Sequence, residues 1–168
     1  MSLLQSNAPG AYPMENTSDL SGMEGKLSHA LLGHWDGLRG SRKMPACDEF
    51  SLMDIYKIAS CLIVLDVVRT DDGRLRHRYR FVGTTIVGYR RNRSPADHTG
   101  MFVDEITRLY SPELLIDCYV RCTEDGVPNL GKGEWKTDTL SGRYERLAVP
   151  LGDEEGVVQQ LAVCIDRL

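Results

Sequence analysis

Four arginines alternate with larger side chains in one short stretch of the chain, RLRHRYRFVG at residues 74–83. Arg74, Arg76, Arg78 and Arg80 are spaced two residues apart, which places their side chains on one face of a β-strand. Aligned guanidinium groups could recognise a phosphate, an anionic nucleotide or an acidic partner. They could also protect a sheet edge, because charges there discourage pairing with another chain. Since no glycine-rich phosphate loop accompanies them, we expect edge protection, with an anion or partner surface as the alternative.

Two histidines could serve as the axial ligand of a haem. His77 alternates with the arginines and shares its face with Leu75, Tyr79 and Phe81, whereas His98 lies in a later loop. We expect His77 to be a hydrogen-bonded core residue and His98 to face solvent, so haem is not expected. A photoreceptor-type flavin is not expected either, because the short Asn-Cys-Arg context is missing. The sequence leaves any cofactor unknown.

The five cysteines predict neither a disulfide framework nor a metal site. They include no CxxC pair, and Cys118 and Cys122 stand one helical turn apart without further ligands nearby. We therefore expect both to be buried and apolar in role. The chain also lacks G-x-S-x-G, H-E-x-x-H and P-loop motifs, so we expect no catalytic residues and no enzyme.

Composition narrows the class of protein. The chain has 168 residues, of which 42% are hydrophobic and 26% charged, enough for one domain with a tail or extra helix. Its net charge of -4 argues against general nucleic-acid binding, for which domains are usually basic. No apolar run approaches the roughly 18 residues that span a bilayer, and the N-terminus lacks a signal-peptide pattern. We expect a cytoplasmic protein.

The first 60 residues predict a tail followed by helices. Residues 1–22 are rich in Ser, Asn, Pro and Gly and are expected to form a flexible tail. Apolar residues at spacings of three and four predict a helix over 23–38, which ends at Gly40. Residues 48–59 predict a second helix with Ser51 as its N-cap. Residues 23–60 are thus expected to hold the N-terminal helices and a linking turn.

Residues 61–168 predict an α+β domain. Strands are expected at 61–70, 74–83, 130–140, 143–151 and 157–168, with Ser141-Gly142 as a hairpin turn and a helix over 111–126. Short turns within each group of strands require antiparallel pairing, and the helical middle lets the last strand return beside the first. We expect a five-stranded antiparallel sheet with helices packed on one face, plus the extra N-terminal helix.

The stretch WDGLRGSRKMPACDEF at 35–50 carries the most specific pattern, W-x3-R-G-x-R-x-x-P. Its marked positions are Trp35, Arg39, Gly40, Arg42, Pro45, Asp48 and Phe50. Together with YRFVGTTIV at 79–87, DHTG at 97–100 and the order of elements, it resembles a short bacterial PAS-like family that usually consists of little else. Cys47, where that family often has a basic residue, and the long link RRNRSPAD depart from the family pattern.

The position of this stretch between two predicted helices indicates a structural clasp. We expect Arg39 or Arg42 to form a salt bridge or to cap backbone carbonyls, and Trp35 to pack on the sheet. If both arginines were unpaired, a partner surface would be the better account.

The resemblance implies a stand-alone sensory, signalling or adaptor domain that acts by binding ligand or protein. It would have no output domain of its own and would act on a separate partner such as a kinase or a cyclase. A small cavity between sheet and helices is the candidate ligand site, and its lining would be Tyr79, Phe81, Ile86, Phe102, Ile106, Leu114, Cys118 and Trp135. A plain filled core is the alternative for these residues. The competing function is a small-molecule enzyme or carrier that uses the same cavity.

The first predicted strand is apolar on both faces, so the outer face of the sheet needs a cover. The helix over 23–38 or a second copy of the chain could supply it. We expect a homodimer.

Overall fold

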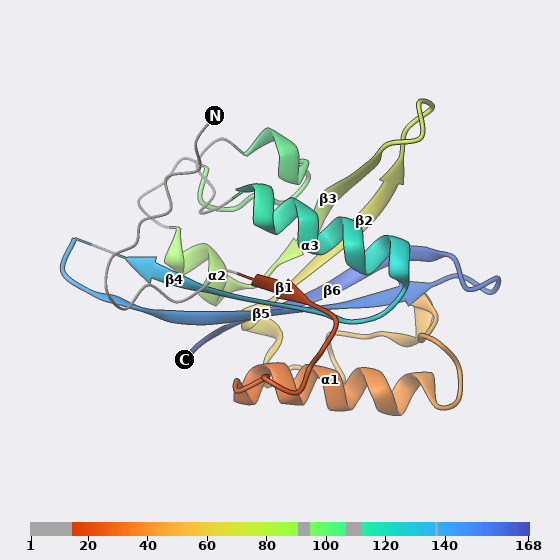
Figure 1. Cartoon of the computed structure of the whole chain (residues 1–168), viewed down its shortest axis with the longest axis horizontal. Helices are drawn as coiled ribbons and strands as arrows, with labels where there is room; N and C mark the ends of the chain where they lie inside the picture. Colours follow the sequence, from red (N-terminus) through yellow and green to blue (C-terminus); the bar gives the residue numbers. More distant parts are fainter. Residues whose placement is uncertain (1–14, 91–94, 107–111, 137) are drawn as a thin grey trace.

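A six-stranded antiparallel sheet runs through the structure in the order β1-β4-β5-β6-β2-β3 (Figure 1). The computed structural model describes residues 15–90, 95–106, 112–136 and 138–168. The strands are β1 (Glu15–Thr17), β2 (Leu62–Arg69), β3 (Leu75–Val82), β4 (Asn129–Lys136), β5 (Ser141–Gly152) and β6 (Val158–Arg167). The helices are α1 (Lys26–Arg39), α2 (Thr84–Tyr89) and α3 (Pro112–Asp125), with 3-10 turns at Cys47–Glu49, Ala59–Cys61 and Val103–Glu105. No helix in these described ranges is long and apolar enough to span a membrane.

The path of the chain through the sheet matches the predicted one. β2 and β3 form a hairpin, β4, β5 and β6 follow one another, and β6 returns to pair with β2. All five predicted strands are present, with bounds that differ by a few residues. This is the PAS-like arrangement that the resemblance implies. The predicted hairpin turn at Ser141-Gly142 is wrong, because both residues already pair with β4.

The predicted strand count is too low by one. β1 pairs with β4 through Glu15↔Lys132, Asn16↔Gly131 and Thr17↔Leu130. These three residues lie within the stretch 1–22 that the sequence predicts as a tail, so that part of the stretch is ordered as an edge strand. The rest of the prediction for residues 1–14 lies outside the described residues. A strand of three residues carries too little apolar periodicity to be read from sequence.

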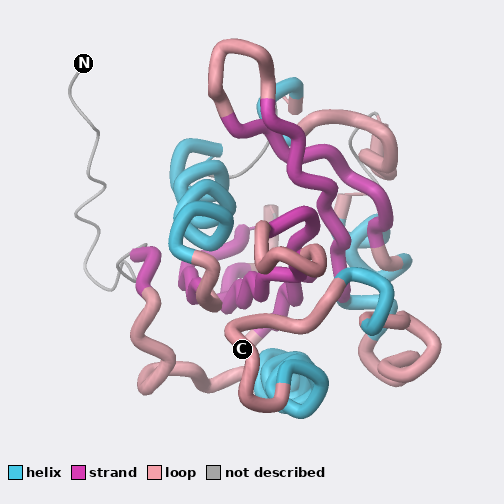
Figure 2. The backbone as a smooth tube through the Cα atoms, turned by 90° about the vertical axis from the view of Figure 1, so that its right-hand side faces the viewer, coloured by secondary structure: helices cyan, strands magenta, loops and turns pink. Residues whose placement is uncertain are grey.

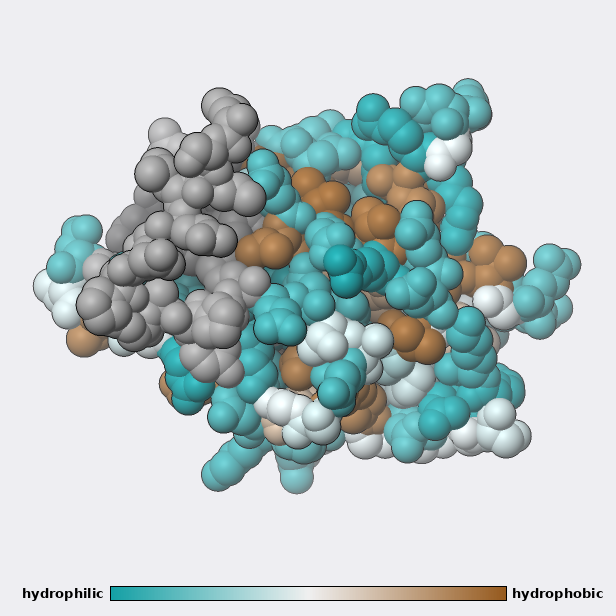
Figure 3. Space-filling view, in the orientation of Figure 1, coloured by the Kyte–Doolittle hydropathy of each residue, from teal (hydrophilic) through white to brown (hydrophobic). Residues whose placement is uncertain are grey.

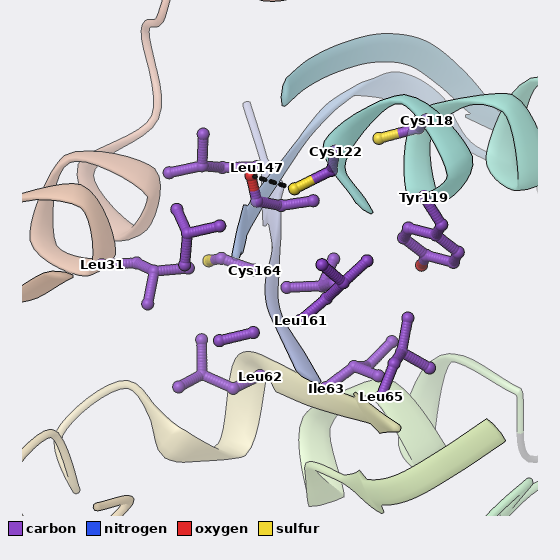
Figure 4. Close-up of a cluster of buried hydrophobic side chains, with 14 of the residues drawn as sticks. Leu31, Leu62, Ile63, Leu65, Cys118, Tyr119, Cys122, Leu147, Leu161 and Cys164 are labelled. Carbon is purple, nitrogen blue, oxygen red and sulfur yellow. Dashed lines mark hydrogen bonds between the residues drawn. The ribbon is translucent and has the colours of Figure 1, made fainter. Parts of the chain in front are cut away.

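Helices cover both faces of the sheet: the other helices were predicted on one face, and the N-terminal helix, one of the two covers that the sequence left open for the outer face, lies on the other. α3 packs on one face and α1 on the other, against β5 and β6 (Figures 1 and 2). We call these the α3 face and the α1 face. Figure 4 shows Leu31 of α1 on one side of the central strands and Cys118, Tyr119 and Cys122 of α3 on the other. The apolar character of β2 follows from this double cover, since Leu62, Ile63 and Leu65 are all buried.

Two carboxylates of the sheet fix the N-terminus of α1. Glu145 on β5 accepts hydrogen bonds from the backbone N–H groups of Glu24 (2.8 Å) and Gly25 (2.9 Å). Asp166, its paired neighbour on β6, accepts one from Leu27 at 2.8 Å. The first N–H groups of a helix lack intrahelical partners and the helix dipole favours negative charge there, so both carboxylates stabilise α1 in place.

The helix predicted over 23–38 is confirmed as α1 and the one over 111–126 as α3, which ends at Gly126 with φ 63°. The helix predicted over 48–59 is wrong. Its backbone forms successive i→i+3 hydrogen bonds, such as Ile55 N–H to Leu52 O and Ile58 N–H to Ile55 O. Ile55 and Ile58 are buried, and their three-residue spacing fits such turns better than an α-helix.

Candidate functional site

Two successive residues of β5 are charged and buried on opposite faces of the sheet. Glu145 faces α1, where it caps the helix, and Arg146 faces α3 with 5% of its surface exposed. A guanidinium group carries its charge at any pH that a protein survives, so the α3 face contains a permanent buried cation. The sequence analysis missed this residue. The signal was a pair of adjacent charges inside a strand whose two faces are both covered.

A glycine on the neighbouring strand makes room for the Arg146 side chain. Gly131 on β4 pairs with Arg146. A Cβ atom at position 131 would lie 2.6 Å from Arg146 Nη2 and 2.7 Å from Asn16 Oδ1. The guanidinium group therefore crosses β4 over a position without a side chain and reaches β1.

The acceptor that Arg146 meets there is neutral. Nη2 of Arg146 donates to Asn16 Oδ1 at 3.0 Å, and the Asn16 amide donates in turn to Leu114 O (2.7 Å) and Asp117 Oδ2 (3.0 Å). Nε of Arg146 is buried and has no hydrogen-bond partner. Within the described residues no carboxylate forms an ion pair with Arg146, so the partners of its charge are neutral groups, the amide of Asn16 and the thiol of Cys118.

Tyr79, Cys118 and Tyr119 lie around this cation, and with Arg146 and Asn16 we call them the Arg146 cluster. The guanidinium carbon lies 5.9 Å from the ring centroid of Tyr119. Burial raises the pKa of Cys118, Tyr79 and Tyr119, and for each of them the charge of Arg146 offsets part of the rise. All three side chains are therefore protonated at neutral pH. The hydroxyl of Tyr79 is buried without a hydrogen-bond partner, which leaves a neutral donor beside the cation.

A second polar group borders Tyr79. Arg90, just after α2, donates to Nδ1 of His98 at 2.7 Å, and the His98 ring lies 5.6 Å from that of Tyr79. Arginine can only donate, so Nδ1 accepts and the proton of a neutral His98 ring is on Nε2. The prediction that His98 faces solvent is wrong, because the ring is buried. The loop that carries it lies along the edge of β3, where Gly100 N–H bonds Tyr79 O.

The residues predicted to line one cavity lie in several parts of the structure. Tyr79, Ile86 and Cys118 are buried, Ile106 packs against the core, and Leu114 is partly buried and binds Asn16 through its backbone oxygen. Trp135 packs on Arg167, whose guanidinium carbon lies 4.1 Å from the Trp135 ring and 3.5 Å from that of Tyr89.

Two residues of the predicted lining lie elsewhere. A register shift between β2 and β3 places Phe81 opposite Val64, on the face of Asp66 and Arg78 and away from Tyr79. The prediction that Phe81 shares a face with Tyr79 is therefore wrong. Phe102 lies at the sheet edge, with the Arg76 guanidinium carbon 3.8 Å from its ring centroid.

Three of the four arginines in the predicted row are paired with carboxylates of the chain itself. Arg76 forms a bidentate pair with Asp104 at 2.7 and 2.8 Å. Arg78 and Arg80 both contact Asp66, at 3.6 and 2.8 Å. Arg74 is exposed in the hairpin turn. This arrangement weakens the alternative of an anion surface and fits the edge protection that we expect from the sequence.

Asp66, Arg78 and Arg80 line a cavity of about 510 Å³ on the α1 face. Gln160 also donates to Asp66 at 3.1 Å, and Cys47 and Asp153 lie at the cavity wall. Its four acidic residues, Asp48, Asp66, Asp153 and Glu154, outnumber its two arginines. The cavity therefore offers no net positive field to an anionic ligand.

The stretch at 35–50 makes the contacts expected of a structural clasp. The indole N–H of Trp35 donates to Pro150 O on β5 at 2.7 Å. Arg39 pairs with Asp36 at 2.6 Å, and Arg42 donates to Leu38 O at 2.7 Å and to Glu49 at 2.8 Å. Ala46 forms a bridge with Gly152, whose N–H bonds Pro45 O at 2.9 Å. The stretch thus ties the end of α1 to the sheet.

Two further predictions concern His77 and the cysteines of α3. His77 is a buried residue that bonds the hydroxyl of Thr123 at 2.9 Å, as predicted. Cys118 and Cys122 are buried, as predicted, and the Cys122 thiol donates to Ala148 O at 3.6 Å (Figure 4). In the described ranges no three His, Cys, Asp or Glu side chains are grouped to hold a metal ion.

No protein-family model matches the sequence, and no curated protein matches it. Among solved structures, the chain is similar to an RNA-binding light-oxygen-voltage receptor with 13% identity and a TM-score of 0.44. The similarity covers 74% of this chain and 35% of the receptor chain. This chain thus spans about a third of that protein, and the strand order, rather than this distant similarity, supports the PAS-like fold.

Proposed function

We propose that the chain is a PAS-like sensory or adaptor domain that acts by binding, and that its Arg146 cluster is the ligand site. The buried cation at Arg146, which meets neutral partners and no carboxylate among the described residues, is the observation that carries the proposal. Burying a charge without an opposite charge costs several kcal/mol, roughly, in an apolar interior. A filled apolar core would not need such a group, whereas a site for a polar ligand would.

The wider role is also part of the proposal. The chain acts in the cytoplasm as a homodimer and passes its signal to a separate protein such as a kinase or a cyclase. The clasp at 35–50 holds α1 on the sheet, so this helix and the strands beneath it form one unit through which binding could reach a partner.

Native mass spectrometry of the full chain, together with thermal unfolding against a panel of neutral, anionic and cationic metabolites, tests the ligand site. We expect a retained small molecule or a saturable rise in melting temperature for the parent protein. Arg146→Met should lose both while it stays folded, because exchanging a buried charge for an apolar side chain of similar size is often neutral or stabilising.

Arg143→Met is the matched control, since Arg143 is an arginine of the same strand with an accessible side chain. It should keep the response of the parent protein. Equal responses of the parent protein and Arg146→Met across the whole panel would rule out the Arg146 cluster as the ligand site.

A further inference from the structure

We propose that Arg146 binds the carboxylate of a small organic acid in the place that the Asn16 side chain occupies, and that β1 gives way to it. The inference rests on the proposed function and names its ligand class. It starts from the hydrogen bonds of one guanidinium group. That group has five N–H donors, and one of them meets the amide oxygen of Asn16 while Nε meets nothing.

The shape of the site fits a carboxylate. The amide of Asn16 is planar and has the size of a carboxylate, so one carboxylate oxygen can take the place of Asn16 Oδ1 against Arg146 Nη2. The other oxygen cannot take the place of the amide nitrogen, which donates to Leu114 O and Asp117, and would turn toward Nε instead. Gly131 keeps the space beside both groups open. A carboxylate would turn one neutral hydrogen bond into a charge-assisted pair that can also reach Nε in a two-point contact.

The charge of the site selects for one carboxylate and against a phosphate. Arg146 is the one cation among the five residues of its cluster, and Tyr79 and Tyr119 are neutral phenols. Arg90 lies near the cluster, with its guanidinium carbon 5.8 Å from the Tyr79 ring centroid, and donates to His98. Arg146 by itself balances a single negative charge, whereas a phosphate dianion would bring a second charge into a buried site. The Tyr79 hydroxyl is buried and unpaired, so it offers a further neutral donor to an acid.

The element that would yield is weakly held. β1 has three residues and lies at one edge of the sheet, next to β4. Its side-chain anchor on α3 is Asn16, which bonds Leu114 O and Asp117. A ligand that takes the bond to Arg146 breaks the bridge between Arg146 and Asp117 and frees β1, so binding is coupled to release of the segment before α1.

The test uses the full chain and three sodium salts, acetate, succinate and benzoate, at constant ionic strength. We expect at least one to raise the melting temperature saturably and to shift the NMR signal of Arg146 Nε–H. Arg146→Met should lose the response, and Arg146→Lys should weaken it about tenfold, because lysine keeps the charge but lacks the two-point contact. Arg143→Met is again the control.

A variant that exchanges the two side chains of the bridge carries its own carboxylate into the site. Asn16→Asp with Asp117→Asn places an acid against Arg146 and an amide where Asp117 stands. We expect it to be more stable than the parent protein without ligand and to bind the three acids about tenfold more weakly, since its own carboxylate competes. Asp117→Asn alone should keep the response.

The outcomes separate the two proposals. If sodium phosphate acts through Arg146 and the acids do not, or if the cluster retains a neutral molecule, the carboxylate inference is wrong and the ligand site remains. If Arg146→Met changes the response to no compound of any class, both the carboxylate inference and the ligand site are wrong. An acid that binds the exchanged variant as tightly as the parent protein would overturn the displacement of Asn16.

Discussion

Burial determines the protonation state of His77 on β3. Its ring is buried, and burial, with a smaller contribution from the charge of Arg69, lowers its pKa to about 4. The hydroxyl of Thr123 donates to Tyr119 O at 2.8 Å, so it accepts from Nε2 of His77. The folded protein therefore holds a neutral imidazole with its proton on Nε2.

This lowered pKa predicts a loss of stability in acid. An unfolded histidine takes up its proton near pH 6.5, whereas folded His77 does so only near its folded pKa. Acid therefore favours the unfolded state between these values, and the free energy of unfolding should fall by about 3 kcal/mol from this residue alone. Urea unfolding at pH 7 and pH 4 should show that His77→Gln loses about that much less than the parent protein.

The control for this comparison is His29→Gln, which changes an exposed histidine of α1. It should follow the parent protein at both pH values. Parallel losses in the parent protein and in His77→Gln would contradict the buried neutral imidazole.

At the scale of elements, the attachment of α1 depends on close approach at Gly25. A Cβ atom there would lie 2.9 Å from Glu145 Oε1 and would overlap the carboxylate of Asp166. Gly25→Ala should therefore push the start of α1 away from its two capping carboxylates. We expect a loss of about 2 kcal/mol in the free energy of unfolding, the upper end of what an N-cap contributes.

The same helix supplies the opposite control. Gly37 has no atom within 4 Å of the position of a Cβ. Gly37→Ala should raise stability by about 0.5–1 kcal/mol, because glycine in a helix loses more backbone entropy than alanine. Chemical denaturation of both variants checks the pair, and a stability change of the same sign in both would refute the role given to Gly25.

Local patterns were enough to predict the larger elements. The β-branched run of β2, the alternation of β3 and the capped periodicity of α3 each appear in a window of about ten residues. The failures depend on contacts between distant residues. β1 exists because of pairing with β4, and residues 48–59 make turns because both ends of the segment are fixed to the sheet. The sequence analysis missed the Arg146 cluster for the same reason, since Arg146, Asn16 and Gly131 meet only after the sheet has formed.

At the scale of the whole molecule, the chain covers its own sheet. The sequence analysis expected either a helix or a second copy of the chain to cover the α1 face, and α1 covers it. One reason to expect a dimer is therefore gone, and the exposed apolar residues are the reason that stays. Figure 3 shows hydrophilic residues over much of one surface, with hydrophobic ones in separate patches. Met53 and Tyr56, three residues apart, are 79% and 67% exposed.

These two residues predict where copies of the chain would meet. Light scattering should give a mass about twice the 18.8 kDa of the chain, since exposed apolar groups drive self-association. Replacing both Met53 and Tyr56 with Glu should return the monomer. Leu140→Glu, which alters another exposed apolar side chain, should leave the dimer intact. A monomeric parent protein at high concentration would refute the homodimer.

The two hydrogen bonds of Glu145 to residues 24 and 25 also set a length. The burial of Met23 and the bond from Lys132 to Gly22 O hold the chain there as well, so a detached β1 would remain tethered at Gly22. Residues 15–22 extend to at most about 26–29 Å. A partner that recognises this detached segment would encounter it at a high effective concentration within that distance of its attachment point. A partner farther away would not reach it.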